Sequence, residues 1–368
     1  MIDELENEEK MTSIRSVLKM LSTLQHFRFI GMIMNRKKVR YEKNSPRIYR
    51  RPATDLCLEF CQENDIEHKG HCLNYVHKTP TWLPDDCDLI RKYLEKRFEQ
   101  ISERYADHIP NWEVINETLC GCDGWKFYYE PDLVKWSFDL AAKYFPKNEL
   151  TINEASQVWY DYRGNRMPYY SMIQRELYNG TRIDSIGMQF HQFYKKEVEE
   201  EHAKTMSNPE SVYKILDLYN SFNKPLQITE VTIPAYSADS GDEEVQAKII
   251  ENLYKIWFSS KNVEAIIYWN MIDGYAAFAE PGDMTAGENY YYGGLMRFDG
   301  TPKPAYNVIK NLFEKEWRTN DKVSTTNGTA WFKGFYGTYD LEITTEGICK
   351  TVQIETSCKN INEFEIKL

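Results

Sequence analysis

Two glutamates stand at the ends of two candidate β-strands, and a pair of carboxylates is what several hydrolytic reactions need. The first strand runs from Trp112 into Glu117, with the amide Asn116 just before the carboxylate, and the second runs from Leu226 to Glu230. Two carboxyl groups that flank a glycosidic bond can hydrolyse it as an acid/base and a nucleophile. A single glutamate after a strand is more often a helix cap or a solvated side chain. Hydrolysis therefore requires that the two carboxylates converge.

The order of elements along the chain predicts that such strand ends meet. From about residue 53, helical patterns alternate with short apolar runs, which is typical of βα units and a parallel sheet. In a (β/α)8 barrel the strands end on one face, where the chemistry of that fold takes place. A doubly wound sheet is the alternative, but the glycine-rich phosphate turn typical of that fold is missing. The expected strands are 71–75, 112–116, 149–153, 185–189, 226–230 and 265–270, and the expected helices are 53–64, 86–106, 131–145, 169–179, 209–222, 243–260 and 304–317.

The length of 368 residues allows one barrel of about 250 residues with roughly 120 to spare. After about residue 318 the composition shifts to Thr, Gly and Asn with alternation of period two, which predicts a small antiparallel β module. We therefore expect an atypical N-terminal segment over 1–38, an α/β TIM barrel over 39–317 and the β module over 318–368. The module is expected to be a structural appendage that packs on the barrel, and carbohydrate binding is the alternative role.

Composition limits the classes of partner. With 45 basic and 56 acidic residues the net charge is −11, which disfavours nucleic acid, and no apolar stretch is long enough to span a membrane. The eight cysteines show no spacing of a zinc site, and only Cys349 and Cys358 are plausible disulfide partners. We expect no metal, no cofactor and a monomer. The acidic start lacks the features of a signal peptide, which predicts a cytoplasmic protein as written, or a secreted one if the start is truncated.

Six motifs in sequence order resemble those of the glycoside hydrolase family 10 endo-β-1,4-xylanases. The resemblance runs from about Arg50 to Trp317, and 113 residues separate the two glutamates. It implies retaining hydrolysis of β-1,4-xylan or xylo-oligosaccharides, with the two carboxyl groups about 5 to 5.5 Å apart. The motifs are Gly70 to Leu73, Trp112 to Leu119 (WEVINETL), Ile186 to His191 (IGMQFH), Ile228 to Val231 (ITEV), Trp269 to Asp273 (WNMID) and Pro302 to Tyr306 (PKPAY).

The resemblance also implies a role for each matched residue. Glu117 is the expected acid/base, and Glu230 is the expected nucleophile. His191 is expected to orient Glu230 and keep it ionised. A negative charge on Glu230 would raise the pKa of Glu117, because two nearby carboxylates resist double ionisation. The expected substrate-binding residues are His71, Tyr75, Asn116, Gln189, Trp269 and Asp273.

Departures around the glutamates put the sugar in doubt more than the reaction. Where the family has a tryptophan and then a second sugar-binding histidine, this chain has Tyr75 and Val76, with His77 one place later. The family tryptophan after the strand-eight motif falls at Ala277, and the family Asn-Asp pair at strand five ends here in Glu154. Two alternatives therefore stay open: a related β-glycosidase for another plant glycan, and a non-catalytic sugar-binding or impaired homologue.

The early barrel strand of the family has no counterpart in residues 11–38. From Arg28 to Arg51 there are nine Lys or Arg and one Glu, and a nucleic-acid-binding arm is one interpretation of this charge. A second hypothesis is a shifted reading frame: codons rebuilt across residue boundaries from Lys19 to Lys38, with permitted wobble bases, give a segment like the missing strand. On that hypothesis we expect the chain to lack a native second barrel strand, and an open sheet edge could leave it unstable or inactive.

Overall fold

The computed structural model describes residues 31–34, 51–75, 83–121, 126–160, 162–345, 347–357 and 361–367, the first four and 51–53 by their backbone alone. The chain divides into two compact units, Met1–Val308 and Ile309–Leu368. The second unit begins earlier than the boundary predicted after residue 317, because it includes the last helical turns as well as the β module.

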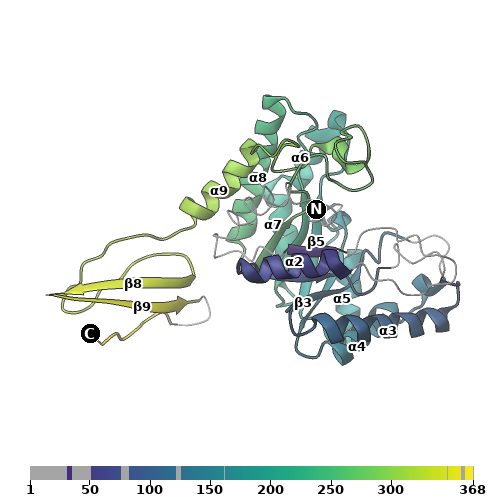
Figure 1. Cartoon of the computed structure of the whole chain (residues 1–368), viewed down its shortest axis with the longest axis horizontal. Coiled ribbons are helices and arrows are strands. Elements are labelled where there is room, and N and C mark those ends of the chain that lie inside the picture. Colours follow the sequence, from purple (N-terminus) through teal and green to yellow (C-terminus); the bar gives the residue numbers. More distant parts are fainter. Residues whose placement is uncertain are drawn as a thin grey trace. The chain divides into compact units, whose positions relative to one another are not determined.

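Parallel strands form a single sheet in the first unit (Figure 1). Their order in the sheet is their order in the chain, from β1 to β7. Helices connect successive strands, as parallel pairing requires. The pairing runs from β1 to β7 and, within the described residues, does not close from β7 back to β1. The α/β class and the barrel-like topology with abnormal N-terminal strands are thus confirmed. The strands are β1 (Gly31–Met34), β2 (His68–His71), β3 (Asn111–Asn116), β4 (Glu149–Glu154), β5 (Ser185–His191), β6 (Leu226–Thr232) and β7 (Val263–Tyr268).

Every predicted helix is present, with bounds that differ by a few residues. The last one is shorter than expected: it ends at Asn311, and the π-helical turn Leu312–Glu316 follows. A short helix, α6, was not predicted. None of the helices that the structure describes combines the length and the apolar character needed to cross a membrane. The helices are α2 (Arg51–Glu63), α3 (Cys87–Tyr105), α4 (Leu133–Tyr144), α5 (Pro168–Tyr178), α6 (Glu199–Met206), α7 (Pro209–Asn220), α8 (Ser240–Ser259) and α9 (Pro304–Asn311).

The central strands β3, β5 and β6 are buried along their whole length. Strands of a parallel sheet are covered on both faces and for this reason are largely apolar. Polar side chains are the exceptions to that pattern, and several of them, such as Asn116, Gln189 and His191, stand at or near the carboxyl ends of their strands. Because all seven strands run in one direction, these polar ends gather at a single edge of the sheet.

Strand β2 lies a few residues earlier than the 71–75 predicted. It spans His68–His71, and its pairing with β3 joins Gly70 to Trp112. A Cβ atom on Gly70 would lie 2.1 Å from the Trp112 indole ring, so only glycine fits there. The strand contains no aliphatic residue, which is why hydrophobic patterning missed its start.

The atypical N-terminal segment lies outside the described residues except for β1. That strand, Gly31–Met34, pairs in parallel with β2, from Gly31↔His68 to Met34↔His71. Our expectation concerned the native second strand of a barrel, so the presence of this four-residue strand does not contradict it. The ladder uses backbone groups that every residue carries, so a short apolar run can occupy an open edge whatever its origin. The reading-frame hypothesis stays a prediction.

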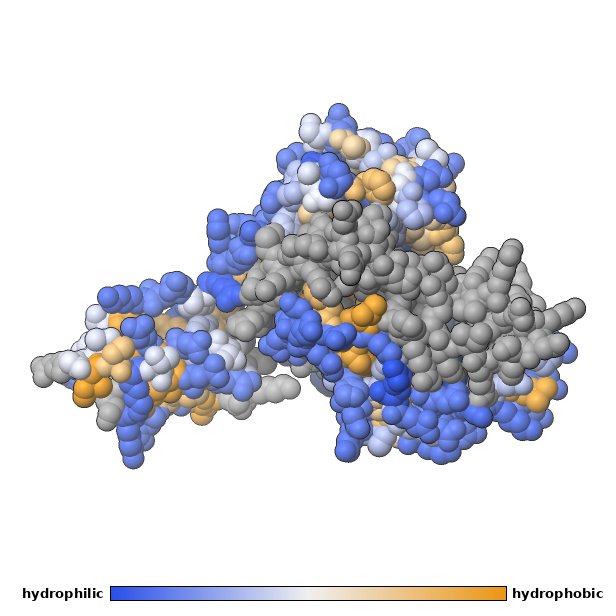
Figure 2. All heavy atoms as spheres, viewed as in Figure 1, coloured by the Kyte–Doolittle hydropathy of each residue, from blue (hydrophilic) through white to orange (hydrophobic). Residues whose placement is uncertain are grey.

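The second unit contains the predicted antiparallel module, a hairpin of β8 (Gly337–Thr345) and β9 (Ile348–Thr356). Residues along β8 alternate between half-buried and exposed positions, the period of a sheet with one covered face. Figure 2 shows apolar atoms among polar ones on this unit, where Ile348, Ile361 and Phe364 are exposed. Cys349 carries a free thiol, so the disulfide considered above is not formed, and Cys358 lies outside the described residues.

Candidate active site

The ends of β3, β5 and β6 bring the two predicted catalytic glutamates to one amide nitrogen. Nε2 of Gln189 donates to Glu117 Oε1 at 2.8 Å and to Glu230 Oε1 at 3.0 Å. Strand register explains this contact, because Gln189 on β5 pairs directly with Glu230 on β6. The two carboxylates thus converge, as the barrel topology predicted.

Glu230 is buried and held by a histidine on the neighbouring strand. Nε2 of His191 lies 3.1 Å from Glu230 Oε2, and Nδ1 of the same ring lies 2.9 Å from the hydroxyl of Thr232. A carboxylate can only accept, so the Nε2 atom carries a hydrogen. In the neutral ring Nδ1 is then the acceptor, and the Thr232 hydroxyl donates to it. The sequence pointed to His191 but not to Thr232.

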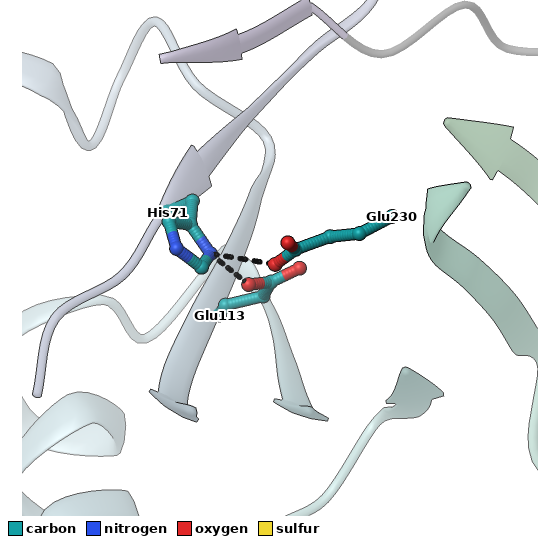
Figure 3. Close-up of side chains that lie close together, drawn as sticks. All are labelled: His71, Glu113 and Glu230. Carbon is teal, nitrogen blue, oxygen red and sulfur yellow. Dashed lines mark hydrogen bonds and ion pairs between the residues drawn. The ribbon is translucent and has the colours of Figure 1, made fainter. Parts of the chain in front are cut away.

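A second histidine, on β2, lies near Glu230. His71 Nδ1 bonds to Glu113 Oε2 and lies 4.0 Å from Glu230 Oε1 (Figure 3). Glu113 is fully buried, and its other oxygen lies 2.9 Å from the Lys69 ammonium, which is itself buried. Burial opposes the charged form of Glu113, yet the charges of Lys69 and His71 outweigh it and lower the Glu113 pKa to about 2. Burial likewise lowers the pKa of His71, but Glu113 beside it and the more distant glutamates leave that pKa above its ordinary value.

Asn116 and Asn153 connect the middle of this network. Asn153 Nδ2 donates to Asn116 Oδ1 at 2.8 Å, and Gln189 Nε2 donates to the same oxygen at 3.2 Å. On its other side Asn153 accepts a hydrogen bond of 2.6 Å from the Thr229 hydroxyl. These bonds orient the Asn116 amide and leave its Nδ2 group as the donor that a substrate hydroxyl can use.

Two aromatic residues that were predicted to bind substrate, Tyr75 and Trp269, lie around the two glutamates. The Tyr75 hydroxyl donates to Glu117 Oε2 at 2.5 Å. On the other side, the Trp269 ring meets the His191 ring edge to face, with centroids 5.5 Å apart. Trp269 is anchored in turn by the half-buried Glu288, which accepts from its indole Nε1 at 2.8 Å. Tyr75 therefore contacts Glu117 directly, while Trp269 contacts the histidine that bonds to Glu230.

Asp273 differs from the other predicted binding residues. Its carboxylate accepts from the Gly294 amide at 2.7 Å and pairs with the buried Lys303 ammonium at 3.1 Å. Lys303 also donates to the carbonyl of Tyr292. The structure thus places Asp273 in a contact that ties down the long loop after β7.

His71, Glu113 and Glu230 are close enough to be tested as metal ligands, since their donor atoms lie within 4.8 Å of one another. However, one oxygen of Glu113 already binds the ammonium of Lys69, and the other binds His71. A dication here would have to compete with a buried ammonium ion for Glu113. The donor set suits an ion-pair network better than a metal centre.

Sequence reasoning missed Lys69 and Glu113. Both lie inside strands rather than at strand ends, and both are fully buried. A signal was available, because charged residues inside a buried strand are rare unless they are paired. The sequence alone, however, does not say that Lys69 on β2 and Glu113 on β3 are each other's partner.

Comparisons with known proteins identify the family of this chain. Residues 9–312 match the model of glycosyl hydrolase family 10. The chain is 26% identical over 308 residues to the anti-sigma-I factor RsgI6 of Acetivibrio thermocellus, covering 80% of this chain and 35% of that protein. It is also 26% identical over 246 residues to endo-1,4-beta-xylanase A of Caldicellulosiruptor saccharolyticus, covering 58% of this chain and 67% of that protein. The chain thus spans about a third of the first relative and about two thirds of the second.

Solved structures show the same fold. Xylanase 10B from Thermotoga petrophila RKU-1, in complex with xylobiose, superposes with a TM-score of 0.60 at 22% identity and covers 76% of this chain and 82% of its own. A GH10 endoxylanase retrieved from sugarcane soil metagenome has a TM-score of 0.58 at 20% identity, with 72% and 84% covered. At these identities the likeness concerns the fold alone. With a family match that spans most of its length and two carboxylates converging at the strand ends, this chain belongs to glycosyl hydrolase family 10.

Proposed function

We propose that the protein is a retaining glycosidase that hydrolyses β-1,4-xylan or xylo-oligosaccharides. The observation that carries the proposal is the single Gln189 nitrogen that bonds to both Glu117 and Glu230. The two carboxylate oxygens can be no farther apart than those two bonds laid end to end. Retaining enzymes have carboxyl groups about 5 to 5.5 Å apart, whereas inverting enzymes leave roughly 6.5 to 9.5 Å for a water molecule. The geometry supports the retaining class.

Each glutamate has one part in each step. Glu230 attacks the anomeric carbon while Glu117 gives its proton to the leaving oxygen, so the glycosidic bond breaks and an ester bond to Glu230 forms. In the second step Glu117 removes a proton from water, the water oxygen bonds to the anomeric carbon, and the ester bond breaks. Glu117 ends protonated and Glu230 ionised, as they began.

The surrounding side chains serve these two glutamates. We assign Asn116 and Gln189 to the hydroxyl groups of the sugar that is cleaved, since both are already oriented by buried hydrogen bonds. His191 donates to Glu230 and favours its charged form. His71 and Trp269 form walls of the same pocket in this proposal, and Tyr75 orients Glu117.

A second candidate substrate is another β-linked plant glycan. The observation that favours it lies in the loop after β7, where Ala277 stands in the place of a family tryptophan. Its amide donates to Glu288 Oε2 at 3.3 Å, and its carbonyl accepts from the Glu288 amide at 2.8 Å. The loop is therefore held together by two bonds between Ala277 and Glu288. Because Ala277 has no ring, this part of the loop offers less aromatic surface to a sugar.

Product analysis on a panel of β-linked polysaccharides tests both candidates. We expect reducing ends to be released from xylan, with the β-configuration retained in the first product seen by NMR. Glu230→Ala should abolish the release, while Glu244→Ala, which removes an exposed carboxylate from α8, should not change it. Full activity of Glu230→Ala would reject the assignment. Calorimetric binding of xylohexaose without turnover would favour a non-catalytic sugar-binding protein.

A further inference from the structure

A buried carboxylate that the proposed mechanism does not use lies at the end of β4, beside the strand that carries Glu117. This residue, Glu154, is fully buried, and its strand pairs with β3 up to Asn116↔Asn153. We infer that Glu154 is a positioning residue for Glu117, because it holds the turn on which Glu117 sits. The inference rests on the proposed role of Glu117 as acid/base.

The contacts of Glu154 converge on the residues that follow Glu117. Its Oε2 atom accepts from the Leu119 amide at 3.0 Å and from the Thr118 hydroxyl at 3.2 Å. The thiol of Cys120 lies 3.8 Å from Oε1. Three consecutive residues after the acid/base therefore touch one carboxylate.

The other half of the same carboxylate is fixed to its own strand end. Oε1 accepts from the Ala155 amide at 2.9 Å and from Gln157 Nε2 at 3.2 Å. Glu154 thus links the turn after β3 to the rigid start of the loop after β4. A carboxylate suits this position because all its neighbours here are donors and it can accept from all of them.

The backbone of Glu117 shows why the turn needs such a support. Its φ angle is 56°, in the left-handed region that residues other than glycine seldom adopt. The amide of Glu117 still bonds to the carbonyl of Asn153, and the amide of Cys120 closes the turn on the carbonyl of Glu117 at 3.3 Å. A strained conformation of this kind persists only where the surroundings hold it. Glu154 supplies part of that support through its bonds to Thr118 and Leu119.

The charge of Glu154 is also coupled to the site. Burial raises the pKa of Glu154 to about 7, against the opposing effect of its backbone and hydroxyl donors, and the charge of Glu117 adds to the rise. Glu117 acts on Glu154 from the turn. The charge of Glu154 in turn raises the pKa values of Cys120 on the turn, Tyr128 after it, Tyr169 on α5 and Tyr219 on α7.

Leaving-group dependence separates a positioning role from a general loss of structure. Glu154→Gln keeps the shape, but whichever way the amide is turned, its NH₂ group meets a donor. We expect kcat/KM for phenyl β-xylobioside, which needs the acid, to fall about tenfold or more. The value for dinitrophenyl β-xylobioside, whose leaving group needs no proton, should change by less than about twofold. Glu154→Asp, which keeps the charge, should recover part of the loss.

Two controls make the result specific. Glu149→Gln changes the carboxylate at the opposite end of the same strand, which accepts a hydrogen bond from Gln227, and should leave the ratio of the two substrates unchanged. In a Glu117→Ala background, Glu154→Gln should add less than about a twofold loss, because there is no acid left to position. Equal losses on both substrates, or a full additional loss in that background, would overturn the inference.

Amide hydrogen exchange gives a readout that does not depend on turnover. The Leu119 amide should exchange faster in Glu154→Gln than in the wild type or in Glu149→Gln, and unchanged exchange would contradict the inference. If the wild type hydrolyses neither substrate, the proposed function fails, and the Leu119 exchange rate alone decides whether Glu154 holds the turn. If Glu154→Gln does not fold, the same measurements on Glu154→Asp decide, with smaller changes expected.

Discussion

Glu230 belongs to a regular strand, whereas Glu117 lies one residue beyond the end of its strand in a left-handed conformation. Glu230 is buried and receives donors from Gln189 and His191 on the adjacent strand. Glu117 is half-buried, and its side chain meets Gln189 and Tyr75. The proposed nucleophile is held by the sheet itself, while the proposed acid/base is held by a turn.

The chemistry proposed for each residue accounts for this difference. A nucleophile has to stay in one position and to be ionised when it attacks, which a strand and two donors favour. An acid/base has to change its protonation state and to reach both a leaving oxygen and a water molecule. From this difference we expect substitutions around Glu230 to slow the hydrolysis of all substrates alike. Substitutions around Glu117 should slow mainly the hydrolysis of substrates with poor leaving groups.

The largest expected effect is the contrast between the two alanine variants. Glu230→Ala should lower kcat/KM by about four orders of magnitude or more on every substrate, because no covalent intermediate forms. Glu117→Ala should cost about 10² to 10⁴-fold with poor leaving groups and far less with dinitrophenol. Steady-state kinetics on a series of aryl β-xylobiosides measures both. If the two variants share one leaving-group dependence, the division of roles is wrong.

Removal of the Lys69 ammonium tests the buried charges in the strands next to Glu230, the proposed nucleophile. Lys69→Met leaves Glu113 charged and buried without its main partner, so the free energy of unfolding should fall by about 3 to 5 kcal/mol. Chemical denaturation measures it. The matched control is Lys214→Met, which breaks an exposed pair with Glu210 and should cost less than about 1 kcal/mol. The double variant Lys69→Met with Glu113→Met should recover part of the loss, and a loss no larger than that of the control would contradict the buried pair.

The dependence of stability on pH should have opposite signs for two buried carboxylates. The pKa of Glu154 is raised from 4.5 to about 7, so its contribution is present in full below about pH 4.5 and is lost as the pH rises to about 7. That loss should amount to roughly 3 kcal/mol. The pKa of Glu113 is lowered to about 2, so its contribution is present above about pH 4.5 and is lost as the pH falls through about 2.

Denaturation curves from pH 5 to pH 8 measure the first of these effects. The slope should become shallower in Glu154→Gln, where the raised pKa of His71 still contributes, and should stay as steep as in the wild type in Glu149→Gln, since Glu149 lies at the other end of the strand. A wild-type stability that does not decrease over this range would show that the donors around Glu154 outweigh its burial.

The smallest expected effect concerns the hydroxyl of Thr232, which bonds to Nδ1 of His191. Thr232→Val removes the donor to Nδ1, so the imidazole loses the bond that presents its Nε2 hydrogen to Glu230. We expect kcat to fall about fivefold to tenfold with both good and poor leaving groups, in proportion to one hydrogen bond. Thr151→Val is the matched control, because that buried hydroxyl bonds to Asn111 and Ser185 outside the site. A loss confined to poor leaving groups would connect Thr232 to the acid/base instead.

Much of the fold could be predicted because strands and helices are local patterns. The apolar run Leu226 to Glu230 and the helical period from Glu243 to Ser260 were identified within a few residues of β6 and α8. Strand β2 was placed too late, because its side chains are polar and it is defined by its pairing with β1 and β3 and by the close approach of Trp112 to Gly70. Helix α6 is short and highly charged, so its apolar signal was too weak to detect.

The candidate site was predicted where residues stand at strand ends and missed where a charge lies inside a strand. Tyr75 and Gln189 were expected to bind substrate, but their contacts with the two glutamates need the spacing of neighbouring strands, about 4.8 Å, which no sequence pattern shows. Asp273 was expected at the same pocket, and only the fold reveals Lys303 as its partner.

By itself the sequence determined the types of residue at the strand ends and the order of the elements that carry them. These follow from local periodicity, which depends on neighbours a few residues apart. Only the tertiary structure decided that Gln189 bridges the two glutamates and that Lys69 neutralises Glu113, and it alone placed Glu154 behind the turn of Glu117. Those contacts join residues that are distant in the chain, and they form only because parallel strands bring their ends to one edge of the sheet.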